Sequence, residues 1–156
     1  MGITVEEGNA FANKYIDAFK AGFAKNNHGE TMGPMFSDKV TWNWSDGVKG
    51  SGDPAPVWEV FQKTWGFMVS EAKLCTPHVL VDTTNSKVII MGDLVINIDG
   101  GLPGQAHLVQ NKICFNLTLE GGKACTWDCY WNNEEPTMLA ALSEVSAALQ
   151  AKQEKF

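Results

Sequence analysis

The sequence contains no arginine, and all twelve of its lysine or arginine positions are lysines. Lysine cannot reproduce the planar, permanently charged guanidinium that pairs with a carboxylate through two parallel hydrogen bonds. The absence therefore excludes mechanisms that need an arginine between carboxylates. A net charge of −6 and a pI near 5.0 also argue against nucleic acid as a partner, because phosphate contacts require clustered cations.

Long apolar runs are also absent. No segment approaches the roughly 18 consecutive apolar residues that a membrane-spanning helix needs. The first residues, MGITVEEGNAF, lack the basic and then apolar profile of a secretory signal. We therefore expect a cytoplasmic protein without a membrane partner.

The sequence also lacks the spacing of cysteines and histidines that is typical of metal sites. Cys75, Cys114, Cys125 and Cys129 form no CxxC pair and no zinc-ribbon pattern, and no two histidines have ligand spacing. We expect four reduced thiols, no metal site and no cofactor.

The sequence has the composition of one globular domain spanning residues 1–156, with 44% hydrophobic residues. Helical periodicity predicts a first helix over 4–26, where Thr4 and Glu7 form a capping box. A short helix over 29–36, a third over 53–65 and a final one over 136–153 follow. The third is expected to present Val57, Val60, Phe61 and Trp65, and the last Leu139, Leu142, Val145 and Leu149.

Alternating or continuous apolar segments predict strands over 40–44, 72–82, 87–99, 107–119 and 124–132. The glycine-rich segment 45–52 is expected to be a loop. Helices that precede a long antiparallel meander predict an α+β fold, in which a curved, mainly antiparallel sheet wraps around the N-terminal helices.

Three sequence strings strengthen this prediction: YIDAF at 15–19, MFSDKVTW at 35–42, and GK at 122–123 before a strand that ends in YW at 130–131. In order and spacing they resemble the nuclear-transport-factor-2, ketosteroid-isomerase and SnoaL-like superfamily, with its cone or cystatin-like roll. The resemblance covers about residues 5–133. The final helix is an addition that many members lack.

The resemblance implies an apolar cavity between the first helix and one sheet face, which would bind a small hydrophobic molecule. It also implies a homodimer formed through the opposite face. Strand alternation places every second residue toward the cavity. The expected ligand-binding residues are Phe19, Trp42, Trp44, Phe61, Phe115, Trp127 and Trp131.

The best-known reactions of the superfamily are disfavoured. Tyr15 corresponds to the tyrosine that donates to the oxyanion in ketosteroid isomerases, but the proton-shuttling carboxylate falls at Trp44, which cannot act as a base. The Asp-Arg-Asp set of limonene-epoxide-hydrolase-like members is excluded by the lack of arginine. Tyr15 is either an oxyanion donor or a tyrosine packed in the core.

Three further polar residues are candidates for catalysis. His107 and Asn111 are four residues apart on the expected inner face, where a histidine acid or base would act beside an asparagine that orients a ligand oxygen. His107 is alternatively a hydrogen-bonded residue at the rim. Asp93 interrupts an apolar strand and is either buried with a raised pKa or directed outward to solvent.

Two functions remain open at this point. The first is a cofactor-independent isomerase, cyclase or dehydratase that uses Tyr15, His107 and Asn111. The second is a ligand-binding or dimerisation module of the same fold without chemistry. A cavity filled by the protein's own side chains is a third, structural possibility.

Overall fold

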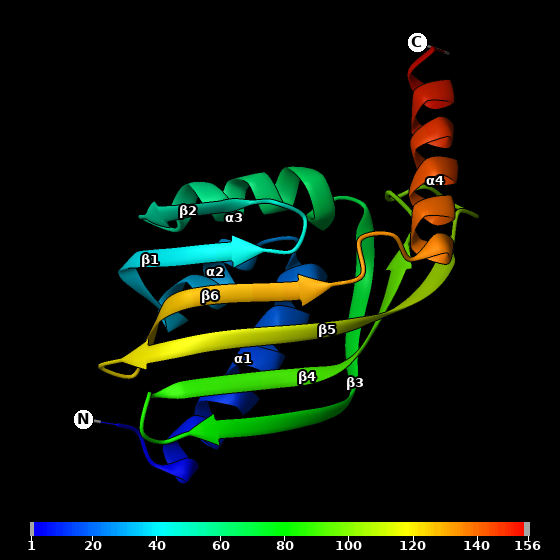
Figure 1. The fold of residues 1–156 in the computed structure, drawn as a ribbon. Helices are drawn as coiled ribbons and strands as arrows, with labels where there is room; N and C mark the ends of the chain where they lie inside the picture. Colours follow the sequence, from blue (N-terminus) through cyan, green and yellow to red (C-terminus); the bar gives the residue numbers. More distant parts are fainter. Residues whose placement is uncertain (1, 155–156) are drawn as a thin grey trace.

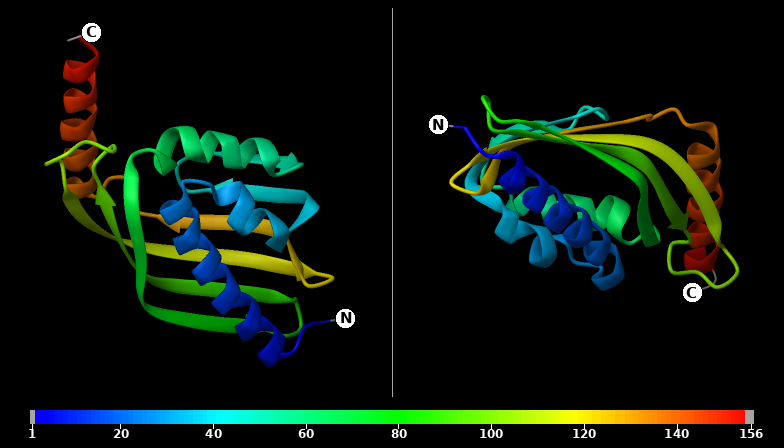
Figure 2. Two further views of the ribbon diagram at one scale, coloured as in Figure 1. Left: turned by 180° about the vertical axis from the view of Figure 1, so that it is seen from behind. Right: turned by 90° about the horizontal axis from the view of Figure 1, so that it is seen from below.

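The computed structural model describes residues 2–154 and contains a six-stranded sheet in the order β2-β1-β6-β5-β4-β3 (Figure 1). The sheet is curved and open, with α1, α2 and α3 on its concave side (Figure 2). The predicted α+β architecture is confirmed. The elements are α1 Val5–Lys25, α2 His28–Met32, η1 Gly33–Met35, β1 Phe36–Trp44, β2 Lys49–Gly52, α3 Ala55–Phe61, η2 Gln62–Gly66, β3 Val69–Asp82, β4 Lys87–Ile98, β5 His107–Glu120, β6 Lys123–Trp131 and α4 Pro136–Glu154.

Helix α1 begins at the predicted capping box. The Glu7 backbone N–H donates to Thr4 Oγ1 at 3.1 Å, and the Thr4 N–H donates to Glu7 Oε2 at 2.7 Å. Asn26 ends the helix in the left-handed conformation, with φ 52°. The buried side of α1 carries Phe11, Tyr15 and Phe23, which pack on the concave face of the sheet.

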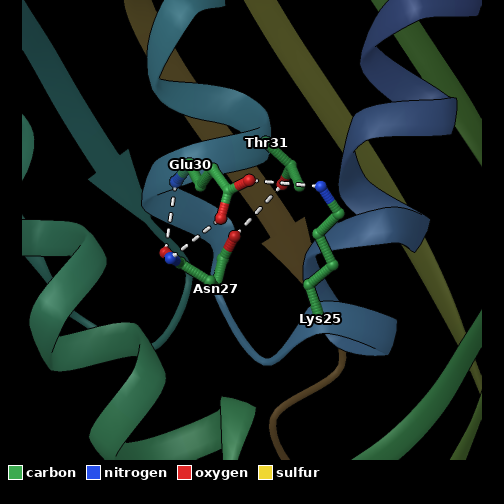
Figure 3. Close-up of polar contacts among 4 residues, drawn as sticks. All are labelled: Lys25, Asn27, Glu30 and Thr31. Carbon is green, nitrogen blue, oxygen red and sulfur yellow. Dashed lines mark hydrogen bonds and ion pairs between the residues drawn. The ribbon is translucent and has the colours of Figure 1, made fainter.

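A compact turn reverses the chain between α1 and α2 (Figure 3). Asn27 caps α2 by accepting a hydrogen bond from the Glu30 backbone N–H at 3.2 Å, and Lys25 forms an ion pair with Glu30, also at 3.2 Å. The Thr31 hydroxyl donates to the Asn27 carbonyl oxygen. This turn places His28 at the start of α2, fully buried beneath α1.

The sheet is antiparallel except where β1 runs parallel to β6. A bulge lies in β6, because Thr118 pairs with Thr126 whereas the next residue, Leu119, pairs with Ala124. Cys125 is the extra residue. Ala124 is consequently fully buried in its place, and the alternation predicted for this end of the strand fails there.

Segment 45–52 is not entirely a loop, because its second half forms the edge strand β2. Asp46 Oδ1 accepts a hydrogen bond from the Val48 N–H, and Gly47 adopts φ 92°, which closes a tight turn after β1. Strand β1 also begins four residues earlier than predicted. From the sequence alone, the turn-forming residues of this short hairpin could not be distinguished from those of a loop.

The predicted helix 53–65 is interrupted. Its α-helical part is α3, and it continues as the π-helical turn η2. Val57 and Trp58 are buried, whereas Val60, which was expected to pack inward, is exposed. The π turn η2 begins after Phe61, and Trp65 still packs against the core, so only Val60 departs from the predicted face.

Helix α4 packs against the end of the sheet by its first half and extends away from it (Figures 1 and 2). Met138, Ala141 and Val145 are buried, whereas Leu139, expected on the buried stripe, is 47% exposed. Within residues 2–154, no helix has the length and apolar character needed to cross a membrane.

Candidate functional site

An apolar cavity lies between α1, the α3–η2 segment and the concave face of the sheet. The helices contribute Phe19, Phe23, Phe61, Trp65 and Met138 to its wall. The sheet contributes a tryptophan-rich surface that includes Trp44, Asn111, Phe115, Trp127, Cys129 and Trp131. Apart from Asn111 and Cys129, every lining residue is aromatic or aliphatic, or is the methionine Met138.

Aromatic rings in the wall pack against one another. The Trp44 and Trp127 ring centroids are 4.6 Å apart in a T-shaped arrangement, and Phe19 meets Phe115 edge-on at 5.3 Å. Trp44 also contacts Phe61 at 6.3 Å. Such pairs add about 0.5–1.5 kcal/mol each beyond the burial of their area, so they stabilise the wall.

The space open to a water-sized molecule measures about 70 Å³. A dry protein cavity that binds benzene measures roughly 150 Å³. The cavity therefore admits a ligand smaller than benzene as it stands. Anything larger requires wall side chains to move apart.

Tyr15 lies behind this wall rather than in it. Its side chain is fully buried, and its hydroxyl oxygen accepts a hydrogen bond from Trp127 Nε1 at 3.1 Å. The Phe115 ring packs against it at 4.9 Å. Burial raises the pKa of the Tyr15 phenol well above its ordinary value of 10.0, and Cys129 adds to the effect, so the group is a neutral core phenol.

His107 lies at the rim, outside the cavity. It shares a sheet face with Asn111, as predicted, but the strand carries it beyond the cavity to α4. Its Nε2 lies 2.7 Å from Glu144 Oε2, and its Nδ1 lies 3.2 Å from the Ile98 carbonyl oxygen. The bond to Glu144 raises the pKa of His107 from its ordinary value of 6.5. These contacts connect α4 to the sheet.

Asn111 is the one predicted polar residue that does line the cavity, and it is buried. Its Nδ2 donates to the Asn132 carbonyl oxygen at 2.9 Å, and its Oδ1 accepts from the Asn132 N–H at 3.2 Å. Nδ2 also lies 3.5 Å from the Met138 sulfur. The amide is thus occupied in holding the corner between β6 and α4.

Asp93 points away from the cavity and forms an ion pair with Lys112 on the outer face, at 3.3 Å. The next residue, Leu94, lines the cavity, as strand alternation requires. The outward interpretation of Asp93 is therefore the one that the structure supports.

Among the predicted ligand-binding residues, Trp42 does not line the cavity. Its ring covers Gly50 on β2, where an added Cβ would lie 2.5 Å from Trp42 Cζ2. The others do line it, namely Phe19, Trp44, Phe61, Phe115, Trp127 and Trp131.

Sequence reasoning missed Phe23, Trp65 and Met138 as cavity residues. Phe23 continues the four-residue spacing of Phe19 on α1, which could have revealed it, whereas nothing local marks Met138 on α4. Cys129 also lines the cavity, and burial raises the pKa of its thiol well above 9.0, which disfavours the nucleophilic thiolate. Within residues 2–154, no three His, Cys, Asp or Glu side chains gather as a metal site.

No family model and no curated protein matches the sequence. Solved structures do match. A "putative polyketide cyclase" from Silicibacter sp. TM1040 has a TM-score of 0.68 at 16% identity, covering 87% of this chain and 96% of the other. An NTF2-like protein from Anabaena variabilis gives 0.64 at 14% identity, covering 86% and 96%. An LEH-like epoxide hydrolase from M. tuberculosis gives 0.61 at 15% identity, covering 94% and 97%.

At these identities the comparison bears on the fold alone. The matches span nearly the whole length of both chains and agree with the predicted order of helices and strands. This chain therefore has the α+β cone fold of the NTF2-like and SnoaL-like proteins.

Proposed function

We propose that this protein binds a small apolar molecule in the aromatic cavity without transforming it. The observation that carries the proposal is the wall itself, which presents apolar surface from both the helices and the sheet. Concave, largely apolar pockets are the usual form of small-molecule sites. The apolar surface of the ligand supplies the affinity, at about 25 cal/mol per Å² removed from water.

The placement of the polar residues favours binding over catalysis. General acid–base catalysis requires a titratable group within hydrogen-bond reach of the ligand. Tyr15 hydrogen-bonds with Trp127 behind the wall, and His107 contacts Glu144 at the rim. The Asn111 amide, which cannot serve as a base, is bonded to Asn132.

The test uses xenon, which the cavity can hold without rearrangement, and toluene, which it can hold only by expanding. Binding is followed by NMR and by tryptophan fluorescence. Leu94→Phe fills the cavity, and Leu108→Phe makes the same change at an exposed position of the outer face. We expect Leu94→Phe to abolish xenon binding and Leu108→Phe to leave it unchanged. Equal binding in the two variants would place the xenon elsewhere.

A second candidate is a cofactor-independent cyclase, isomerase or dehydratase. It is favoured by the neighbours named as polyketide cyclases and by the presence of Asn111 in the wall. The reaction would use Asn111 and Tyr15 after the wall has opened. For any substrate found, unchanged turnover in both Tyr15→Phe and Asn111→Leu would rule out this assignment.

We further propose that a second copy of the chain packs on the outer sheet face. Leu108 on β5 is 77% exposed, and Leu80 and Tyr130 are exposed on the same face. Burying such side chains is favourable. Sedimentation should show a dimer that Leu108→Lys converts to a monomer, whereas a wild-type monomer at all concentrations would refute the assembly.

A further inference from the structure

His28 is a fully buried imidazole directly behind the cavity wall. Its ring centroid lies 4.4 Å from that of Phe23, 4.7 Å from Phe61 and 5.7 Å from Phe19. All three phenylalanines line the cavity. A change in the position of the imidazole is therefore transmitted to the wall by direct contact.

Both ring nitrogens of His28 face oxygen atoms that can only accept a hydrogen bond. Nδ1 lies 2.9 Å from Gln62 Oε1, and Nε2 lies 3.1 Å from the Phe19 carbonyl oxygen. A neutral imidazole carries one N–H, so it satisfies one contact and directs a lone pair at the other oxygen. An imidazolium donates to both.

The orientation of the Gln62 amide follows from two other hydrogen bonds. Its Oε1 accepts from the His28 backbone N–H at 2.8 Å, and its Nε2 donates to Asn26 Oδ1 at 2.6 Å. Exchanging the amide oxygen and nitrogen would set an NH₂ group against the His28 N–H. The oxygen is therefore the atom that faces the imidazole ring.

Two glycines make room for this network. A Cβ added at Gly22 on α1 would lie 2.3 Å from His28 Cδ2, and one added at Gly66 would lie 2.3 Å from Gln62 Nε2. Gln62 begins η2, and Trp65 of the same turn lines the cavity. The network thus joins α1, α2 and the η2 side of the wall.

The charged side chains near His28 pair with each other or face solvent, so they would not neutralise a positive charge on its ring. Lys25 of α1 and Glu30 of α2 pair with each other (Figure 3), and Glu59 and Lys63, on either side of Gln62, are exposed. Burial lowers the pKa of His28 from 6.5, while the contacts with Gln62 and Phe19 oppose that effect. The ring is thus neutral at pH 7 and gains its proton in acid.

We propose that His28 is a proton-operated clamp on the cavity wall: the protonated ring donates to Gln62 and Phe19 together, holds η2 against α1 and closes the cavity. With the ring neutral, one contact is lost and Phe61 and Trp65 can move apart to admit a ligand. The effect on ligand rests on the proposed binding function. Apolar ligands are admitted at neutral pH and excluded in acid.

The experiment titrates ¹⁵N-histidine-labelled protein by NMR and measures toluene binding at about pH 5 and about pH 7.5. His78→Asn and His107→Asn assign the remaining histidine signals to His28. We expect both His28 nitrogens to become protonated in the folded protein below pH 6.5. Toluene should then bind about fivefold more weakly, the effect of one hydrogen bond.

A matched pair of variants separates the clamp from general acid effects. Gln62→Glu sets a carboxylate beside the ring, which raises the pKa of His28, so toluene binding should weaken at a higher pH than in the wild type. Gln153→Glu makes the same substitution at an exposed position of α4 and should leave the midpoint unchanged. An unmoved midpoint in Gln62→Glu, or equal toluene affinity at the two pH values, would overturn the clamp.

Failure of the proposed binding function gives a different result. In that case toluene binds at neither pH, and the clamp is judged by the NMR signals of the Trp65 indole. A Trp65 signal that shifts with the His28 titration supports the clamp. A Trp65 signal that stays constant, or a His28 ring that stays neutral until the protein unfolds, refutes it.

Discussion

Replacing Gly22 by alanine tests the packing of His28, because helix propensity and tertiary contact predict opposite effects. Alanine is favoured over glycine in a helix interior by about 1 kcal/mol. At this position, however, the new methyl carbon would lie 2.3 Å from His28 Cδ2 and 2.6 Å from Nε2. Neither atom is the end of a flexible chain, so the whole ring must move.

Displacing the ring has two costs. Overpacking in a core costs roughly 1–3 kcal/mol. The neutral ring makes one of its two possible hydrogen bonds, to Gln62 or to Phe19, and stretching that bond forfeits about 1 kcal/mol. After the gain in propensity, we expect Gly22→Ala to lower the free energy of unfolding by about 2 kcal/mol.

Urea unfolding followed by tryptophan fluorescence measures this change, with Gly33→Ala as the matched control. A Cβ added at Gly33 meets no atom within 4 Å, and its φ of −48° is open to any residue. Gly33→Ala should therefore be neutral or slightly stabilising. A Gly22→Ala protein as stable as the wild type would refute the tight packing of His28 against α1.

Three further changes probe the site. Asn111→Leu removes the two hydrogen bonds between the Asn111 amide and the Asn132 backbone and should cost about 1–3 kcal/mol in chemical unfolding, so full stability would show that the Asn132 groups find other partners. The contact with Glu144 raises the pKa of His107, so this contact stabilises the fold fully below pH 6.5 and is lost as the pH rises through the raised pKa. His107→Gln should abolish this pH dependence of stability. If the dependence persists in the variant, another group is responsible for it. Trp65→Ala should enlarge the cavity and lower the free energy of unfolding by up to about 3 kcal/mol. Toluene should bind this variant more tightly than the wild type. Unchanged toluene affinity would show that Trp65 does not limit ligand size.

Periodicity in the sequence was sufficient to predict most of the architecture. The capping box located the start of α1, and alternation along β5 separated buried Asn111 and Phe115 from exposed Leu108. Helix caps and strand alternation depend only on residues that are close together in the sequence, so they can be recognised without the structure. Prediction failed at the β6 bulge around Cys125, because one extra residue in a strand changes the face on which the neighbouring residues lie.

The candidate site was only partly predictable. Six of the seven expected ligand-binding side chains line the cavity, and Trp42 does not. Alternation predicts which face a side chain occupies but not how far along a curved strand the cavity extends. That is why His107 shares a face with Asn111 and still lies outside the cavity.

The sequence by itself determined the α+β cone, the aromatic character of its concave face and the exclusion of arginine-dependent chemistry. Only the tertiary structure decided what the polar residues do, because their partners come from distant segments. Asn111 meets Asn132, His107 meets Glu144, and His28 meets Gln62. Hydrogen bonding depends on positions in space, so the partner of a polar side chain cannot be inferred from its neighbours in the sequence.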